Sequence, residues 1–326
     1  MLNNSINELR TNLPREFDYF LHGYEIDLAA DGDSADYFAS VSRIGPHARE
    51  VIEYIYKDSI IKKSMEKNSS VFLDNFLDKW LNNEELWTLA ENLWLEFDMD
   101  CIDPARPAAS FFAGVAIDPD FSHNPARCKR FIELINNSGI YDFGDKIISE
   151  LFRHIELLHP RTPFSHIGQM SSRGESSARA LAINFSRRGI IEYLEKIEWP
   201  GDLEALDSEI GRFDGLYDAL SLQYEIVDRG VGEKIGVEFY ALGPDIYIKQ
   251  KKFLELLFQM GAANPLAARA VAEFSGYDPS SSQGFEIDGR RFEAYGLKRA
   301  IHHFKLTFGG GINKWKAYLA AEYDWK

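Results

Sequence analysis

Short β-strands that come in pairs alternate with pairs of amphipathic helices along almost the whole chain. The strands are recognised by apolar and polar residues in alternation, with Gly, Asp or Pro turn signals between the two members of a pair. The pattern predicts about five strand pairs. They cover 24–28 and 37–43, 94–100 and 110–117, 164–171 and 179–185, 220–228 and 235–242, and 301–308 and 315–323.

Helix pairs are predicted between these hairpins, because apolar residues there recur at spacings of three and four. Pro46 is expected to open the first helix. Asp202, which follows the helix-breaking Pro200-Gly201, is the expected N-cap of a later one. The predicted helices cover 46–55 and 71–81, 125–135 and 143–158, 189–197 and 202–213, and 251–260 and 265–274.

The last part of the chain departs from this repeat. Residues 276–284 are rich in Ser, Gly, Asp and Pro and are predicted to form a loop, and 285–295 a small hairpin through Asp288-Gly289. The turn of the fourth strand pair is expected at 230–232. The final segment is predicted to be a strand, because Gly309-Gly310-Gly311 favours a hairpin; a terminal helix is the alternative.

Strand periodicity also predicts which side chains share a face. In 94–100, Leu95 and Phe97 lie opposite Trp94, Glu96 and Asp98. Amphipathic helices bury their apolar stripes only against the apolar face, so the polar face is expected to point into a lumen. The alternative is an open sheet whose polar face meets solvent. The other polar faces are Ser221, Gln223 and Glu225; Gly236, Glu238 and Tyr240; and His303, Lys305 and Thr307.

The predicted fold class is α+β, with repeated ααββ units that close an antiparallel barrel of about ten strands surrounded by helices. A parallel α/β fold is disfavoured, because there single strands alternate with helices. No long polar linker divides the chain, so 1–326 is expected to form a single domain. A barrel of this size leaves a cavity, provided that the first and last strands pair.

Composition narrows the classes of partner. A hydrophobic content of 45% excludes a disordered chain, and a net charge of −15 argues against nucleic acid and anionic membranes while allowing a cationic partner. Cys101 and Cys128 are too few for a disulfide framework or a cysteine-rich zinc site. Residues 1–20 lack an apolar core, and no long apolar run follows, so we expect a cytoplasmic protein without signal peptide or membrane span.

Familiar catalytic motifs are absent from the sequence. It contains no Gly-rich phosphate loop, no G-x-S-x-G elbow, no H-E-x-x-H pair and no Asp-Asp-x-x-Asp motif. Asp98, Asp100 and Asp103 form either a capped acidic loop or a divalent-cation site, and the loop is the preferred interpretation. His302 and His303 are expected on opposite strand faces, where they cannot chelate one metal. No protein-held metal site is predicted.

The repeat of strand pairs and helix pairs makes nearly the whole chain resemble, in architecture, the ABBA, or PT-barrel, prenyltransferases. The chain also resembles bacterial proteins encoded near peptide-modifying genes, which would make the acceptor a peptide, as in cyanobactin-type peptide prenyltransferases. The segments that carry this second resemblance are WLEFD from Trp94, SHIGQMSSR from Ser165, EKIGVEFY from Glu233, and FKLTF and KAYLA near the end. The resemblance implies transfer of an isoprenoid from its diphosphate to a peptide or a small aromatic or basic acceptor, in the maturation of a peptide natural product.

The resemblance also implies roles for particular residues. In that family, inward Lys, Arg and Tyr side chains, often spaced Lys-x-Tyr, hold the diphosphate where charge develops. Here Lys316 and Tyr318 have that spacing, Lys305 lies on the partner strand, and a carboxylate, Glu96, is the expected base toward the acceptor. The other candidate substrate-binding residues are Lys234, Tyr240, Arg179, His166, Gln223, Glu238, Asp98 and Trp94, with Arg43 and His303 as weaker candidates.

One departure from the family keeps other functions open. Glu96, Asp98, Glu225 and Glu238 would repel a diphosphate unless Mg²⁺ or a cationic acceptor offsets them. Mg²⁺ accompanying the diphosphate is therefore the candidate cofactor. The alternatives are a non-catalytic barrel that binds a cationic peptide and a barrel enzyme that acts on a guanidinium or amine substrate.

Overall fold

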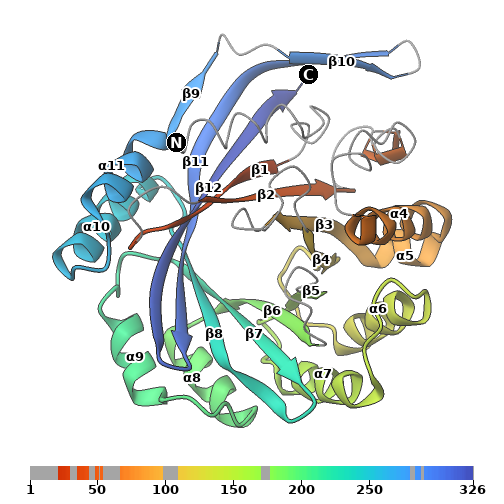
Figure 1. Cartoon of the computed structure of the whole chain (residues 1–326), viewed down its shortest axis with the longest axis horizontal. Helices are drawn as coiled ribbons and strands as arrows, with labels where there is room; N and C mark the ends of the chain where they lie inside the picture. Colours follow the sequence, from red (N-terminus) through yellow and green to blue (C-terminus); the bar gives the residue numbers. More distant parts are fainter. Residues whose placement is uncertain are drawn as a thin grey trace.

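The strands form one antiparallel sheet with helices packed around it (Figure 1). The computed structural model describes residues 21–29, 35–43, 48–50, 52–53, 67–97, 109–169, 177–279, 283–287 and 290–325. The strands are β1 (Leu21–Asp27), β2 (Ala35–Ser42), β3 (Ala90–Phe97), β4 (Ala109–Val115), β5 (Phe164–Gln169), β6 (Ala178–Phe185), β7 (Ala219–Val227), β8 (Gly230–Tyr240), β9 (Gly276–Asp278), β10 (Gln283–Ile287), β11 (Arg290–Gly309) and β12 (Ile312–Trp325).

Ten of these strands close into a barrel, which confirms the predicted fold class. The order around the barrel is β11-β12-β1-β2-β3-β4-β5-β6-β7-β8, and β8 pairs back onto β11. The first and last strands do pair: Leu21 lies opposite Glu322 and Asp27 opposite Lys316. β9 and β10 pair with the remaining, first half of β11.

Helices connect the hairpins on the outside of the barrel. The described helices of more than one turn are α4 (Lys67–Asn82), α5 (Glu84–Leu89), α6 (Pro125–Asn137), α7 (Asp145–Leu157), α8 (Arg187–Lys196), α9 (Leu203–Gly211), α10 (Ile246–Gln259) and α11 (Pro265–Phe274). Asp202 caps α9 as predicted, because its side chain accepts a hydrogen bond from the Ala205 N–H at 2.9 Å. Half of the helix predicted at 46–55 lies outside the described residues, and the described residues 48–50 and 52–53 are helical.

The structure corrects several predicted boundaries. β3 begins at Ala90 rather than Trp94, directly after the unpredicted helix α5. The fourth hairpin turns at 228–229, because Gly230 already pairs with Val227, so the expected turn at 230–232 was wrong. Part of the predicted loop at 276–284 is strand β9, which pairs with β11. Residues 31–33 and 173–175, which join the strands of the first and third predicted pairs, lie outside the described residues.

A triple-glycine turn joins β11 to β12 and makes the closing strand possible. Gly309, Gly310 and Gly311 have φ angles of +98°, +59° and +77°, which favour glycine. A Cβ on Gly309 would lie 2.1 Å from the Glu233 carbonyl oxygen. The chain therefore reverses tightly and the final segment is a strand, as predicted.

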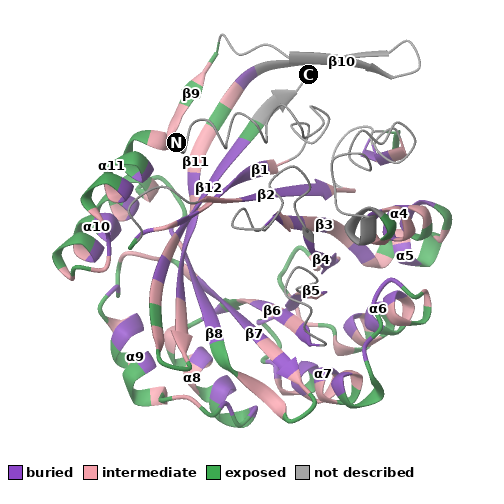
Figure 2. Cartoon of the chain, viewed as in Figure 1, coloured by how far each residue is buried: buried purple, intermediate pink, exposed green. Residues whose placement is uncertain are grey.

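The core lies between the barrel wall and the helices (Figure 2). Leu95 and Phe97 are fully buried on the outward face of β3, as the strand periodicity predicted. One aromatic cluster fills the space under α10, where the Phe253 ring lies 4.3 Å from that of Phe213 and 4.4 Å from that of Phe304, centroid to centroid. Burial of this apolar face leaves the polar face for the lumen.

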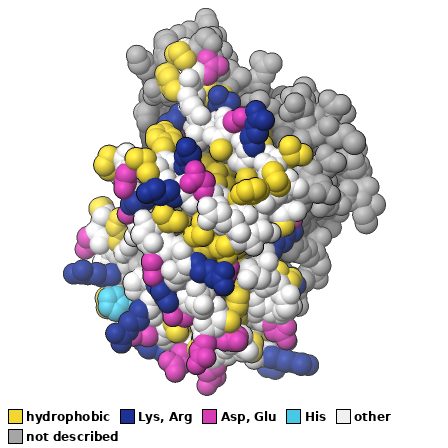
Figure 3. All heavy atoms as spheres, turned by 90° about the vertical axis from the view of Figure 1, so that its left-hand side faces the viewer, with side chains coloured by type: hydrophobic (Ala, Val, Ile, Leu, Met, Phe, Trp, Pro, Cys, Tyr) yellow, Lys and Arg dark blue, Asp and Glu magenta, His cyan; other side chains and the backbone are white. Residues whose placement is uncertain are grey.

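The outer face that carries α10 and α11 mixes charged with apolar side chains (Figure 3). Exposed apolar residues there are Tyr247, Ile248, Phe258, Leu266 and Tyr277. Within the described part of the chain, no helix is both long and apolar enough to cross a membrane. Cys128 is a buried free thiol, and burial raises its pKa to about 12; Cys101 lies outside the described residues.

The aromatic cluster gives a test of the packing. Phe253→Ala should lower the free energy of unfolding by about 3–5 kcal/mol, because it leaves a cavity between α10 and the barrel. Phe258→Ala on the same helix is the matched control, since Phe258 is 52% exposed and its loss should change stability by less than about 0.5 kcal/mol. Chemical denaturation measures both values, and similar losses for the two variants would contradict this packing.

Candidate functional site

The inward faces of the strands line two adjoining cavities. The first, of about 300 Å³, lies toward the hairpin turns, and we call it the polar chamber. The second, of about 420 Å³, lies toward the strand ends that connect to helices, and we call it the aromatic chamber. Glu96, Gln223 and Tyr318 line both and mark the boundary between them.

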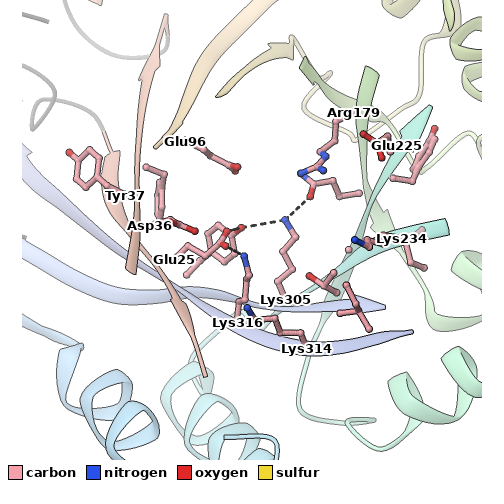
Figure 4. Close-up of a pocket in the computed structure, with 18 residues that line it drawn as sticks. Glu25, Asp36, Tyr37, Glu96, Arg179, Glu225, Lys234, Lys305, Lys314 and Lys316 are labelled. Carbon is pink, nitrogen blue, oxygen red and sulfur yellow. Dashed lines mark hydrogen bonds and ion pairs between the residues drawn. The ribbon is translucent and has the colours of Figure 1, made fainter. Parts of the chain in front are cut away.

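Charged side chains dominate the polar chamber (Figure 4). Each charge comes from an inward strand position near a hairpin turn, as strand alternation requires. Acidic and basic side chains come from neighbouring strands, as with Glu225 on β7 opposite Arg179 on β6, so opposite charges lie close together in a small volume. The cations are Arg179, Lys234, Lys305, Lys314 and Lys316, and the carboxylates are Glu25, Asp36, Glu96 and Glu225.

Lys316 and Tyr318 project from one face of β12, the Lys-x-Tyr arrangement expected from the sequence. Both contact Glu25 of β1: the Lys316 ammonium donates to Oε1 and the Tyr318 hydroxyl to Oε2. The β1–β12 register places Glu25 directly opposite Tyr318. Burial lowers the pKa of Lys316 to about 8, and the ion pair with Glu25 acts in the opposite direction.

Lys305 lines the polar chamber, next to the boundary residues Gln223 and Tyr318, and is 7% exposed. Its Nζ donates to Gln223 Oε1 at 2.6 Å and to the Tyr318 hydroxyl at 3.3 Å, and lies 3.8 Å from Glu238 Oε1. Gly236 makes room for it, since a Cβ there would lie 2.7 Å from Lys305 Cε. The ammonium group is therefore held in place before any ligand arrives.

Two cations of the polar chamber are available to a ligand. Among the described residues, Arg179 and Lys234 form no ion pair, although both line the chamber. Lys314, by contrast, pairs with Asp27 at 2.5 Å. Glu225 accepts a hydrogen bond from the Ser177 hydroxyl at 2.5 Å. An entering anion would thus meet Arg179 and Lys234 without first breaking an ion pair.

Rings line the aromatic chamber. The Tyr318 ring stacks on the His303 ring, with 4.2 Å between the ring centroids. The centroid of the Tyr240 ring lies 5.0 Å from that of His303, and the centroid of the Trp94 ring lies 6.1 Å from that of His302. Aliphatic and aromatic side chains complete the wall, so this chamber suits an apolar or a soft cationic group. These further lining residues are Phe112, Phe121, Leu181, Ile183 and Leu242.

The two adjacent histidines of β11 share one face, which contradicts the prediction that they lie on opposite faces. The β11–β12 register shifts between Ile301 and His303, and this irregularity turns both rings into the aromatic chamber. Their Nδ1 atoms lie 2.7 Å apart. Burial lowers the pKa of His302 to about 4 and that of His303 well below its ordinary value, so at neutral pH one uncharged ring donates and the other accepts.

The remaining polar groups of the aromatic chamber are hydrogen-bonded. His166 lines the chamber as expected; its ring nitrogens lie 2.6 Å from Ser165 Oγ and 2.9 Å from Asn92 Oδ1, and burial lowers its pKa to about 4. The Tyr240 hydroxyl donates to Glu238 Oε2 at 2.7 Å. Burial, reinforced by the Glu238 charge, raises the pKa of Tyr240 well above its ordinary value.

The structure brings together almost all of the residues that the sequence singled out. The polar chamber contains Lys305, Lys316, Lys234 and Arg179, and the aromatic chamber contains Trp94, His166, Glu238 and Tyr240. Glu96, Gln223 and Tyr318 lie between them. Asp98 lies outside the described residues, as do Asp100 and Asp103. Arg43 does not line either chamber, because its Nε donates to the Ala90 carbonyl oxygen at 3.0 Å.

Three charged residues of the polar chamber are not among those that the sequence singled out: Glu25, Asp36 and Lys314. The signal for Glu25 was present, since it alternates with the buried Tyr24 and Ile26. The described residues contain no group of three His, Cys, Asp or Glu side chains that could hold a metal ion.

No family model matches the chain, and a search of curated proteins finds no match either.

The buried histidines predict acid sensitivity. In the unfolded chain a histidine takes up its proton near pH 6.5, whereas the pKa of buried His302 is about 4, so the free energy of unfolding should fall as the pH drops from about 6.5 to 4. His302→Gln should make this slope shallower by up to about 1.4 kcal/mol per pH unit. Ser221→Ala in the same wall should keep the wild-type slope, and denaturation at several pH values measures all three. An unchanged slope in His302→Gln would contradict the neutral buried ring.

Proposed function

We propose that the barrel transfers an isoprenoid group from its diphosphate to a nucleophilic acceptor. The observation that carries the proposal is the contiguity of a cation-lined chamber and an aromatic chamber, joined at Glu96, Gln223 and Tyr318. A ligand with a highly charged anionic head and an apolar tail matches that division. The acceptor is a peptide or a small aromatic or basic compound, modified in the cytoplasm during natural-product maturation.

The polar chamber would bind the diphosphate. Arg179, Lys234 and Lys305 surround the space in which its oxygens would lie, and the Tyr318 hydroxyl and Lys316 extend the set along β12. When the bond between the isoprenoid C1 and the diphosphate oxygen breaks, the electron pair stays on that oxygen. Cations held in place beforehand stabilise this developing charge, because they need no reorganisation as it forms.

The aromatic chamber would hold the isoprenoid chain and the acceptor. The rings of Trp94, Tyr240 and Tyr318 present π-faces that stabilise positive charge on the allylic carbons. The imidazoles of His302 and His303 are uncharged at neutral pH, so they do not repel that charge.

Glu96 is the proposed base. It lines both chambers, so its carboxylate lies where the isoprenoid C1 would pass from the diphosphate to the acceptor. The acceptor atom forms the new bond to C1, and the proton that it loses goes to the Glu96 carboxylate. The diphosphate leaves with its electron pair, so charge and atoms balance.

The acidic residues favour a second candidate, a barrel that binds or modifies a cationic peptide through its guanidinium or amine groups. Glu25, Asp36, Glu96 and Glu225 line the polar chamber, and the chain carries a net charge of −15. Saturable binding of an Arg-rich peptide, without binding of any isoprenoid diphosphate, would favour this function over transfer.

Donor binding can be tested by thermal-shift titration with dimethylallyl and geranyl diphosphate, each with and without Mg²⁺. A ligand that binds only the folded state raises the melting temperature, so we expect a saturable rise. Lys316→Ala combined with Tyr318→Phe should abolish it, whereas Lys251→Ala on the exposed surface of α10 should not. No rise at millimolar ligand would count against the transferase and favour the peptide-binding barrel.

The role of Glu96 can be tested separately. Glu96→Gln should lower turnover by about a hundredfold or more while preserving the donor-induced thermal shift, because only proton transfer is lost. Mass spectrometry of peptides that each carry one aromatic, amine or guanidinium side chain measures the added C5 units. Glu225→Gln, the same change elsewhere in the polar chamber, is the control. Full turnover by Glu96→Gln would rule out Glu96 as the base.

A further inference from the structure

The Lys316–Tyr318 pair, the part of the polar chamber expected to grip a diphosphate, is already bound by a carboxylate of the protein itself. Glu25 accepts from the Lys316 ammonium with one oxygen and from the Tyr318 hydroxyl with the other. A cation and a hydroxyl donor converging on two oxygens is also how a phosphate group would be bound. We propose that Glu25 occupies the anion position of this pair, so that a phosphate-bearing ligand has to displace its carboxylate in order to bind. This inference rests on the proposed function.

The backbone fixes Glu25 in this position. β1 and β12 pair without a register shift over the segment in which Glu25 faces Tyr318 and Asp27 faces Lys316. The Glu25 side chain is 11% exposed and that of Lys316 is 21% exposed, so little water competes for the contact. Figure 4 shows Glu25 and Lys316 directed toward each other inside the chamber.

The rest of the chamber indicates how displacement would proceed. Arg179 and Lys234, on β6 and β8, form no ion pair with any described residue, whereas Lys316 and Lys314 on β12 are neutralised by Glu25 and Asp27 of β1. An anion would therefore bind first toward β6 and β8. Its second group would then reach β12 only by exchanging places with the Glu25 carboxylate.

This exchange selects for ligands with several negative charges. A ligand with a single anionic group that replaces Glu25 gains little electrostatic energy at Lys316, since one anionic group takes the place of another. A diphosphate contacts Lys316 and Tyr318 with one phosphate while the other stays on Arg179 and Lys234, so its additional charge compensates for the displacement. Glu25 thus acts as a specificity-determining residue that favours diphosphates over monophosphates.

Calorimetric titration with inorganic diphosphate and with inorganic phosphate tests the inference. Glu25→Gln should bind diphosphate about tenfold more tightly than wild type, which is about 1.4 kcal/mol, and should discriminate less against phosphate. Glu25→Asp keeps the charge but withdraws the carboxylate by one methylene, and should also bind more tightly. Glu225→Gln removes the same charge from the same chamber without contacting Lys316, so its gain in affinity should be clearly smaller than that of Glu25→Gln.

Each other result contradicts the inference. Equal gains in Glu25→Gln and Glu225→Gln would mean that only the overall charge of the chamber matters. If the wild type binds diphosphate and the affinity of Glu25→Gln and Glu25→Asp is unchanged or lower, Glu25 only positions Lys316. The proposed transferase would then stand. Absence of diphosphate binding in wild type and in every folded variant would overturn both the inference and the proposed donor site.

Discussion

The pairing of β12 with β1 is the constraint on which the rest of the structure depends. It joins the two ends of the described chain, from Leu21 opposite Glu322 to Asp27 opposite Lys316, and so turns a sheet with two edges into a closed barrel. Closure gives the polar face of each strand an enclosed volume instead of bulk solvent. Without it, Glu25 and Lys316 would be ordinary surface charges on separate edges.

Position along the strand then divides the lumen. Antiparallel hairpins place residues near the turns at one end and residues near the helix connections at the other. The charged side chains cluster at the turn end, as with Lys234 and Lys314, and the rings at the helix end, as with Trp94 and Tyr240. The two chambers are therefore a property of the register, because almost all of the described residues that line them belong to the barrel strands.

Much of this could be predicted from alternation alone. The inward positions of Glu96, Gln223, Glu238 and Lys305 follow from a period of two, and the structure places all of them in the lumen. Alternation fails where the ladder is irregular: the register shift at β11 turns His302 inward, and nothing in the local pattern signals it.

Contacts between strands that are far apart in sequence could not be predicted either, because alternation assigns a residue to a face but does not identify its neighbours. Glu25 and Lys316 are separated by 291 positions in sequence and meet only through closure. A strand pattern identifies each of them as inward, and the register alone makes them partners. The same limit applies to Lys305 and Gln223, which are separated by 82 positions.

The charge balance of the polar chamber links the stability of the empty barrel to its binding. Five cations brought into one partly enclosed cavity would repel one another, so carboxylates that face them stabilise the unliganded fold. Each such carboxylate also weakens the attraction for an anionic ligand. Glu25 has both effects most directly: it stabilises the empty barrel and weakens the binding of an anion, since it contacts both Lys316 and Tyr318. A nearly neutral lumen is therefore compatible with an anion site, provided that the ligand brings enough charge to replace an internal partner.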